Sequence, residues 1–581
     1  MKTVIKDILK RYKWKILLEV LFIIINVYFY TYPSQILGQI IDLLYNAQEN
    51  KIMITKLAVI MLGACVGTLL TRMVWKNLEF LIETKMTKEL KDKLFTKLLK
   101  SKIDNLGKIK NGEIMSYFVS DVKMIARIIT KLTSTGPRII TFFVIVIIRM
   151  SNGCDPKLTL AVMSPIIITI IVVIFIRNRV SASFKKAQQS FTELSEYVQE
   201  STDSVRTMKA FVGEEKQIET FIDKNKKLRK SNLQVSKNQN ILDICINFGF
   251  GIAYAITLLY GSKLVLDGKI TIGDIVAFNS YLILLENPVT WIPWLISRFK
   301  KFKISYDRVN KMFNLPEEEI EINNTKKYKS LNGNVEIKNL TFKYPGCLEN
   351  VLENININVK KGETLGIIGM IGSGKTTLMN LLLKLYSVER GKIYIDDKDI
   401  NDIPTEKIRE HICYITQDNF LFSASLKENI NLFKDQYKDE EIEASTKNAM
   451  IYDDICYMQD GINTIIGEKG IDLSGGQKQR VVISRAFLSN SDIVIFDDTF
   501  SALDNRTEQH LLKNIKQLTK DKTCIIVSNR VSDIKHCNKI IVLDGGEIAE
   551  SGTHNALLKK QGLYYEFYNN QAQQSKSEML A

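Results

Sequence analysis

Apolar residues are gathered into long runs in the first half of the chain. Three of these runs contain no charged residue, namely Val20–Ile41, Leu158–Ile176 and Ile244–Ser262. A helix needs about 20 apolar residues to cross the hydrocarbon core of a bilayer, and soluble core helices of that length rarely lack charge altogether. The pattern therefore predicts that these three runs are membrane-spanning helices.

Three further runs are apolar, but each carries or adjoins one charged residue. They are Leu57–Thr71, which continues through Arg72, Leu132–Ile148, which contains Arg138, and Ile275–Ile296, which is interrupted by Glu286. Their length and hydrophobicity still favour membrane spans. We therefore expect six spans in total.

Two long segments between the predicted spans, Lys76–Lys131 and Arg177–Asn240, are rich in Lys and Arg. Such segments stay on the cytoplasmic side of a membrane, which places the N-terminus there as well. Both segments keep a helical period and are too long for simple turns. We expect the spans to continue as helices well beyond the bilayer.

The pattern changes in the second half of the chain. Residues 314–334 are polar and turn-rich and are predicted to be a linker between a membrane domain, residues 1–313, and a second domain. Short β-branched runs then alternate with helical segments over residues 335–570, which is typical of a parallel α/β sheet. Residues 571–581 are predicted to form a disordered tail.

Charge and cysteine content narrow the class of protein. The formal net charge of +15 comes largely from lysines beside apolar runs, which favours the cytoplasmic face of a membrane over nucleic acid as a partner. The eight cysteines contain no CxxC pair, so neither a zinc site nor a disulfide framework is expected. The opening segment "MKTVIKDILKRYKWKI" is basic and amphipathic, and we expect it to lie on the membrane surface rather than to be a cleavable signal.

A phosphate-binding motif lies early in the α/β region. The segment "GIIGMIGSGKTTL" has the G-x-x-x-x-G-K-[ST] spacing between a predicted strand and a predicted helix. In such a loop backbone N–H groups cradle phosphates, the lysine neutralises them and the hydroxyl after it binds Mg2+. The residues expected to contact ATP here are Gly369, Met370, Ile371, Gly372, Ser373, Gly374, Lys375, Thr376 and Thr377.

A second chemical signal is the apolar strand that ends in two adjacent acids, Asp497 and Asp498. Paired carboxylates at a strand end are commonly delivered to a metal ion or a reacting water. With the phosphate cradle present, Asp497 is expected to act on Mg2+, together with Thr376. A purely structural carboxylate is the alternative.

The segment "GIDLSGGQKQR" places a glycine pair at the start of a helix, which is a further anion-binding terminus. Its residues Leu473, Ser474, Gly475, Gly476 and Gln477 resemble the signature motif of ATP-binding cassette (ABC) proteins. Together with the phosphate cradle, the strand ending at Asp497 and the "SALD" turn after it, this resemblance is specific. Six spans followed by one cassette look like an ABC exporter half-transporter.

The resemblance implies several further roles. In that family two cassettes close head to tail on two ATP molecules, so this chain would pair with a second half-transporter and lend its signature to the partner's ATP. Tyr344 would stack on adenine, although an aromatic ring before a Pro-Gly turn is often mere packing. Gln417 would contact Mg2+ and the attacking water, although an isolated loop glutamine is usually solvated.

The chain departs from the family pattern at two positions. Hydrolytic members have Glu and His where this chain has Asp498 and Asn529. Shortening the carboxylate by one methylene moves it about 1.5 Å, and a misplacement of about 1 Å can cost roughly a hundredfold in rate. Asn529 can donate a hydrogen bond to a γ-phosphate but lacks the positive charge that an imidazole carries. The chain thus resembles the degenerate-site subunit of bacterial heterodimeric multidrug exporters.

We therefore expect a multi-pass protein of the bacterial plasma membrane with a cytoplasmic cassette, which moves drug-like, lipid or peptide substrates outward as part of a heterodimer. A homodimer with slow ATPase and an ATP-gated regulatory or channel-like protein are the alternatives. A soluble DNA-maintenance ATPase would not need the six spans.

Glu286, the only acid within the sixth span, is a candidate for the substrate cavity. A buried pair with Arg138 or Arg72, or a protonated carboxyl, is the structural alternative.

Overall fold

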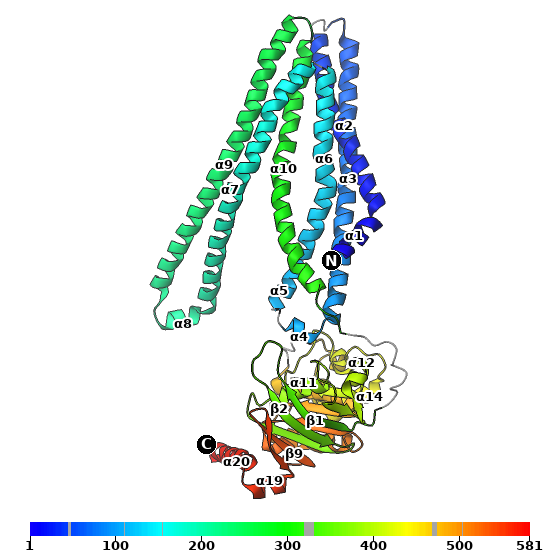
Figure 1. Cartoon of the computed structure of the whole chain (residues 1–581), viewed down its shortest axis with the longest axis vertical. Coiled ribbons are helices and arrows are strands. Elements are labelled where there is room, and N and C mark those ends of the chain that lie inside the picture. Colours follow the sequence, from blue (N-terminus) through cyan, green and yellow to red (C-terminus); the bar gives the residue numbers. More distant parts are fainter. Residues whose placement is uncertain are drawn as a thin grey trace. The chain divides into compact units, whose positions relative to one another are not determined.

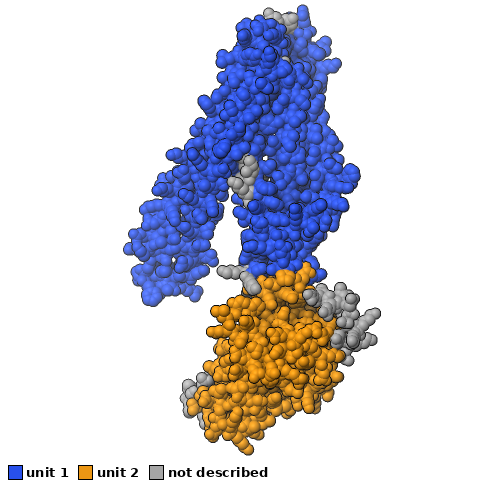
Figure 2. Space-filling view, viewed as in Figure 1, with its two compact units in different colours: residues 1–100, 109–315 blue, residues 101–108, 316–581 orange. Residues whose placement is uncertain are grey.

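The computed structural model describes residues 1–44, 48–107, 109, 111–153, 155–318, 331–467, 473–501 and 503–580. It divides the chain into two compact units, coloured separately in Figure 2. Unit 1 contains residues 1–100 and 109–315, and unit 2 contains residues 101–108 and 316–581. Each unit is described by itself below.

The described residues of unit 1 form helices joined by short turns (Figure 1). Its helices are α1 (Lys2–Arg11), α2 (Lys13–Leu44), α3 (Lys51–Lys100), α5 (Asn111–Ser116), a π-helical turn (Tyr117–Asp121), α6 (Val122–Gly153), α7 (Pro156–Asp203), α8 (Val205–Ala210), α9 (Glu214–Leu266) and α10 (Ile272–Phe313). Within the described residues, six helices are long and apolar enough to cross a membrane, which confirms the predicted spans.

The long helices extend well past the length that a bilayer requires. Helix α3 has 50 residues and α9 has 53, so each runs for about 75–80 Å at 1.5 Å per residue. Figure 1 shows α7 and α9 lying side by side, joined by the short α8, and diverging from α2, α3, α6 and α10 toward that end. These helices are thus longer than a bilayer requires, and their continuation beyond the membrane stays a prediction.

One buried carboxylate of unit 1 is paired with two cations. Glu79 of α3 accepts hydrogen bonds from Lys131 Nζ at 2.7 Å, Lys76 Nζ at 2.8 Å and Ser134 Oγ at 2.8 Å. Two cations and a hydroxyl around one buried carboxylate offset much of the cost of removing it from water. This cluster joins α3 to α6.

Unit 2 is built on two sheets. The four-stranded sheet has the order β2-β1-β4-β5 and is antiparallel, with β1 (Val335–Phe342), β2 (Leu352–Val359), β4 (Ile393–Ile395) and β5 (Lys398–Asp399). The six-stranded sheet has the order β10-β9-β3-β8-β7-β6, with β3 (Thr364–Gly369), β6 (Ile412–Ile415), β7 (Ile493–Asp497), β8 (Thr523–Val527), β9 (Lys539–Asp544) and β10 (Glu547–Gly552). Every pairing in it except β9 with β10 is parallel. The predicted parallel α/β region is thus confirmed.

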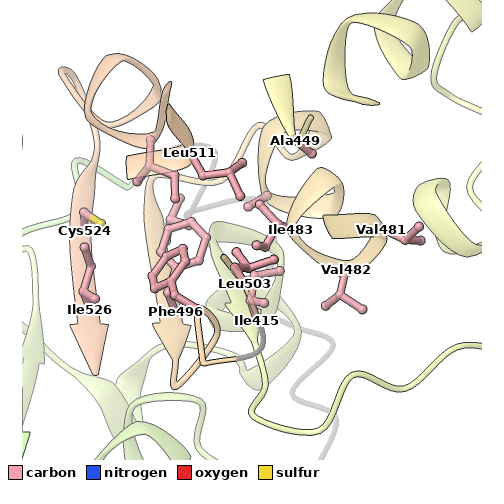
Figure 3. Close-up of a cluster of buried hydrophobic side chains, with 14 of the residues drawn as sticks. Ile415, Ala449, Val481, Val482, Ile483, Phe496, Leu503, Leu511, Cys524 and Ile526 are labelled. Atoms are coloured by element: carbon pink, nitrogen blue, oxygen red, sulfur yellow. The ribbon is translucent and has the colours of Figure 1, made fainter. Parts of the chain in front are cut away.

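Unit 2 also contains a series of helices, several of which pack on the parallel sheet. They are α11 (Lys375–Leu382), α12 (Thr405–His411), α13 (Leu426–Asn431), α14 (Asp439–Asn448), α15 (Tyr452–Cys456), α16 (Gly475–Leu488), α17 (Asn505–Leu518), α18 (Val531–Ile534), α19 (His554–Lys560) and α20 (Leu563–Leu580). One buried cluster joins α16 and α17 to β7 and β8, with Phe496 at its centre (Figure 3). A second cluster fills the space between the two sheets and α11. Both faces of β7 are consequently buried, which explains its uninterrupted apolar sequence.

Two segments differ from the sequence-based expectation. Helix α20 continues to Leu580 through residues predicted to be a disordered tail. That stretch contains no Gly or Pro and many good helix formers, so helix propensity prevails over its polarity. Residues 101–108, with the short helix α4 (Ile103–Leu106), group with unit 2 although the neighbouring helices belong to unit 1. Most of the predicted linker, residues 319–330, lies outside the described residues.

The burial of Phe496 generates a stability prediction. Phe496 is 0% exposed, whereas Leu348 is 98% exposed. We expect Phe496→Ala to remove about 3–5 kcal/mol of stability through the cavity it leaves, which lowers the melting temperature of a cassette this size by roughly 10 °C. Leu348→Ala should leave it unchanged. Calorimetry of the full chain in detergent measures both, and equal melting temperatures would contradict the assigned core.

Candidate functional site

The carboxyl ends of β3, β7 and β8 meet at one cavity of about 280 Å³ in unit 2. Parallel pairing sets Ile367 beside Val527 and Val527 beside Asp497. Since the chain leaves each strand at the same edge, the loops after these strands must converge there. The cavity is lined by Val351, Ile371, Gly372, Gly374, Lys375, Thr376, Thr377, Gln417, Asp497, Asp498 and Asn529.

The loop between β3 and α11 has the backbone shape of a phosphate cradle. Gly372 and Gly374 have φ of +88° and +96°, in the left-handed region that side chains disfavour. A Cβ at Gly374 would also lie 2.6 Å from Leu352 Cδ2 and 2.9 Å from the Val351 carbonyl oxygen. Gly374 precedes the first residue of α11, so the N–H groups at that helix end face the cavity. Glycine is required here on two independent grounds.

Lys375 lies within this cradle with its charge only partly solvated. Its Nζ donates to the Gly369 carbonyl at 2.7 Å and to the Met370 carbonyl at 2.9 Å. Burial lowers the pKa of Lys375, and the nearby Asp497 and Asp498 act in the opposite direction. A phosphate bound in the cavity would place a negative charge beside this ammonium group and favour its protonated form.

Asp497 closes β7 at the floor of the cavity. Burial raises the pKa of Asp497, and hydrogen bonds from Tyr414 and Thr376 counteract this. The Tyr414 hydroxyl donates to Asp497 Oδ2 at 2.8 Å. A buried carboxylate beside a threonine hydroxyl fits one part of a Mg2+ coordination shell. Gln417, which lines the same cavity, would supply a further oxygen, and phosphate oxygens and water would complete the shell.

The next residue, Asp498, turns into the cavity from a left-handed backbone with φ of +46°. Aspartate is one of the few residues that tolerate this region. Gln417 Nε2 donates to Asp498 Oδ2 at 3.4 Å, a long bond that brings together two residues far apart in sequence. Asn529 lines the same cavity, and its Oδ1 is buried with no hydrogen-bond partner. The structure thus gathers Gln417, Asp498 and Asn529 at one place.

Tyr344 lies beside the cradle but is engaged with its neighbours. Its hydroxyl is 2.9 Å from Thr377 Oγ1, and its ring makes edge contacts with Phe342 and Tyr386. The ring is partly exposed, so a face remains available for a base. Its stacking on adenine stays a prediction.

The signature residues are absent from the residues that line this cavity. Ser474 caps α16 by accepting from Gln477 N at 3.3 Å, and Gln477 Oε1 accepts from Ser474 N at 3.0 Å. Gln477 Nε2 also donates to Asp454 Oδ1 at 2.8 Å, and Leu473 is buried in the cassette core. Ser474 and Gly475 are exposed and form a second surface on unit 2. Residues 468–472, which include the first part of the quoted motif, lie outside the described residues.

In unit 1, Glu286 of α10 is exposed, and no ion pair of it is found among the described residues. Arg138, its suggested partner, instead lies against aromatic rings, with Cζ 4.5 Å from the Trp291 ring centre and 5.3 Å from that of Trp75. The structural alternative of a buried Glu286–Arg138 pair is therefore not seen.

Two contacts at the site escaped the sequence analysis. Tyr414 touches Asp497 from β6, and Gln571 contacts the backbone around Asn529 from α20. Neither residue belongs to a motif, and Gln571 falls in the stretch that composition marks as a tail. Only the fold brings them to the site.

Comparison with protein families matches both parts of the chain. Residues 16–289 match the family model described as ABC transporter transmembrane region, and residues 352–501 match the one described as ABC transporter. The chain is also similar to a solved structure of a bacterial Atm1-family ABC exporter with ATP bound, with a TM-score of 0.78, 24% identity, and coverage of 97% of this chain and 98% of that one. At this identity the likeness concerns the fold.

Curated relatives extend over most of the chain. The probable multidrug resistance ABC transporter ATP-binding/permease protein YheI of Bacillus subtilis is 33% identical over 494 residues, which are 84% of this chain and 83% of that protein. The multidrug resistance-like ATP-binding protein MdlA of Escherichia coli is 30% identical over 539 residues, 93% of this chain and 91% of that protein.

The geometry at Gly374 generates a binding prediction. We expect Gly374→Ala to weaken ATP binding roughly 10- to 100-fold, because a side chain at this φ costs about 1–3 kcal/mol before the clash is counted. Gly251→Ala is the control, since its Cβ would meet nothing within 4 Å. Filter binding of labelled ATP to the full chain measures both, and unchanged affinity in Gly374→Ala would refute the cradle.

Proposed function

The chain belongs to the ABC transporter family, as a half-transporter with one membrane domain and one cassette, and from this premise we propose that it is an exporter subunit whose own site holds ATP and hydrolyses it slowly. It is a multi-pass protein of the cell membrane with its cassette on the cytoplasmic side. The cassette is an ATP-binding unit, and energy for transport comes from ATP.

The observation that carries the proposal is the pair Asp498 and Asn529 in the same cavity as the intact cradle. A general base must come within about 2.6–3.2 Å of the water it deprotonates. An aspartate backbone that the sheet fixes cannot move forward to replace the missing methylene, because Asp498 N is tied to the Val527 carbonyl at 2.8 Å. Asn529 supplies a donor without positive charge, so less of the charge developing on the γ-phosphate is stabilised.

The exposed signature motif is available to the ATP site of a second cassette. Ser474 and the glycines after it cap a well-formed helix whose N-terminus favours an anion. Within one chain the signature lies outside the cavity, so it would serve ATP bound to another cassette. A second half-transporter with Glu and His at the two altered positions would then carry rapid hydrolysis, with this chain completing its site. A homodimer would hold two slow sites instead.

The membrane unit gives a substrate hypothesis. Two relatives are named for multidrug resistance, and we propose drug-like molecules as the substrate class ahead of lipids and peptides. Glu286 is exposed on α10, and no ion pair of it is found among the described residues. A carboxylate within a membrane span costs a few kcal/mol unless it faces water or a cation. A water-filled cavity that receives cationic substrates meets this requirement.

The hydrolysis proposal predicts a gain of function. The double variant Asp498→Glu, Asn529→His should raise the ATPase rate of the purified chain by roughly a hundredfold. The glutamate extends the carboxylate toward the attacking water, and the histidine places positive charge beside the γ-phosphate. Leu348→Ala is a matched control on the exposed cassette surface. Release of phosphate in detergent and in lipid measures the rates. A wild-type chain that already turns over near 10 per second, typical of enzymes, would contradict the proposal.

The cavity hypothesis predicts a selective loss of export. Glu286→Gln should preserve assembly and basal ATPase while lowering transport of a cationic dye several-fold more than that of a neutral dye, since it removes the charge and keeps the size. Transport into inverted vesicles measures both dyes. Equal loss for the two dyes would assign Glu286 a structural role.

A further inference from the structure

Helix α20 contacts the segment directly after β8. Gln571 Nε2 donates to the Asn529 carbonyl at 2.7 Å, and Val531 N donates to Gln571 Oε1 at 2.8 Å. One side chain therefore bridges the backbone on both sides of residue 530. The orientation of the amide is fixed by chemistry, because a carbonyl needs a donor and an N–H group needs an acceptor.

Gln571 is held by a helix that is itself anchored in the cassette. Glu550 accepts from Leu563 N at 3.0 Å and from Tyr564 N at 3.3 Å, which fixes the start of α20. Tyr564 is 0% exposed and its hydroxyl lies 2.8 Å from His554 Nδ1. Tyr564 and Gln571 are seven residues apart, so they lie on the same face of the helix. The bridge thus rests on a rigid support.

The residues on either side of Asn529 are also fixed. Ser528 N donates to the Ile367 carbonyl at 3.0 Å, and Ser528 Oγ donates to Asp533 Oδ2 at 2.6 Å. The Arg530 backbone N–H donates to Ser528 Oγ at 2.9 Å. The Asn529 carbonyl and the Arg530 N–H belong to one peptide group, so Gln571 and Ser528 hold that group together from its two sides.

Asn529 is the residue of this segment that lines the cavity. Its Oδ1 is buried with no partner, while the backbone behind it is bonded to Gln571. Because no described group bonds Asn529 Oδ1, the direction of this side chain depends in part on the backbone that carries it. A misplacement of about 1 Å would break a hydrogen bond from this amide to a terminal phosphate.

We propose that Gln571 is a positioning residue for Asn529, so that α20 controls how well this cassette distinguishes ATP from ADP. The inference rests on the proposed function, in which Asn529 contacts the γ-phosphate. ADP lacks that phosphate, so its binding depends on the cradle alone. Loss of the bridge should therefore affect ATP and leave ADP unchanged.

The test compares MgATP and MgADP affinities of the full chain in detergent by calorimetric titration. Gln571→Ala should weaken MgATP binding about 3- to 10-fold, as expected for two lost hydrogen bonds, with MgADP affinity unchanged. Gln573→Ala is the matched control, because Gln573 lies two residues further along the same helix and is exposed. Gln571→Glu should give an intermediate loss, because it keeps the acceptor for Val531 N and removes the donor to the Asn529 carbonyl.

A double variant separates positioning from general stability. If Gln571 acts through Asn529, Gln571→Ala should add nothing in an Asn529→Ala background, because the two effects share one contact. Equal weakening of MgATP and MgADP by Gln571→Ala, or full additivity with Asn529→Ala, would overturn the inference. A wild-type chain without preference for MgATP would instead contradict the proposed role of Asn529. A wild-type preference that survives in Gln571→Ala would contradict only the positioning role.

Discussion

The parallel pairing of β3, β8 and β7 is the constraint on which the nucleotide site depends. The segments that follow these three strands are far apart in the sequence. They leave the sheet at one edge and form the cavity together. The strands are buried on both faces and bonded along their length, so the loops start from fixed points. A rigid frame of this kind makes the chemistry sensitive to small changes in side-chain length.

Because of this sensitivity, Asp498 and Asn529 in place of Glu and His would slow ATP hydrolysis without preventing ATP binding. The cradle depends on backbone shape and on Lys375, whose hydrogen bonds to the Gly369 and Met370 carbonyls involve neither Asp498 nor Asn529. The proposed function therefore keeps the binding energy for the phosphates and reduces the reach or charge of the groups that act on a water and on the γ-phosphate. The signature helix lies elsewhere on the cassette and keeps its capping bonds. In this account the chain stores ATP in one site and supports hydrolysis in another.

Much of this architecture could be predicted from the sequence because it depends on local patterns. Apolar runs such as Val20–Ile41 indicate spans through length alone, and the cradle at Gly369–Thr376 has a fixed spacing because phosphate binding requires it. Contacts that depend on tertiary packing were not predictable. Gln571 lies in a polar stretch that resembles a disordered tail. Its hydrogen bonds to the Asn529 carbonyl and Val531 N form only when α20 packs beside α18. Likewise, Arg138 pairs with aromatic rings rather than with Glu286, a choice that charge patterns along one chain cannot reveal.

The fate of ATP bound to this cassette tests the central claim most directly. The full chain would be loaded with labelled ATP and Mg2+, separated from free nucleotide, and quenched in acid at intervals before the nucleotides are separated by chromatography. The account predicts that the bound nucleotide remains ATP for minutes. Conversion of most of it to ADP within about a second, the time that a typical enzyme rate implies, would contradict the claim that Asp498 and Asn529 form a site that holds ATP.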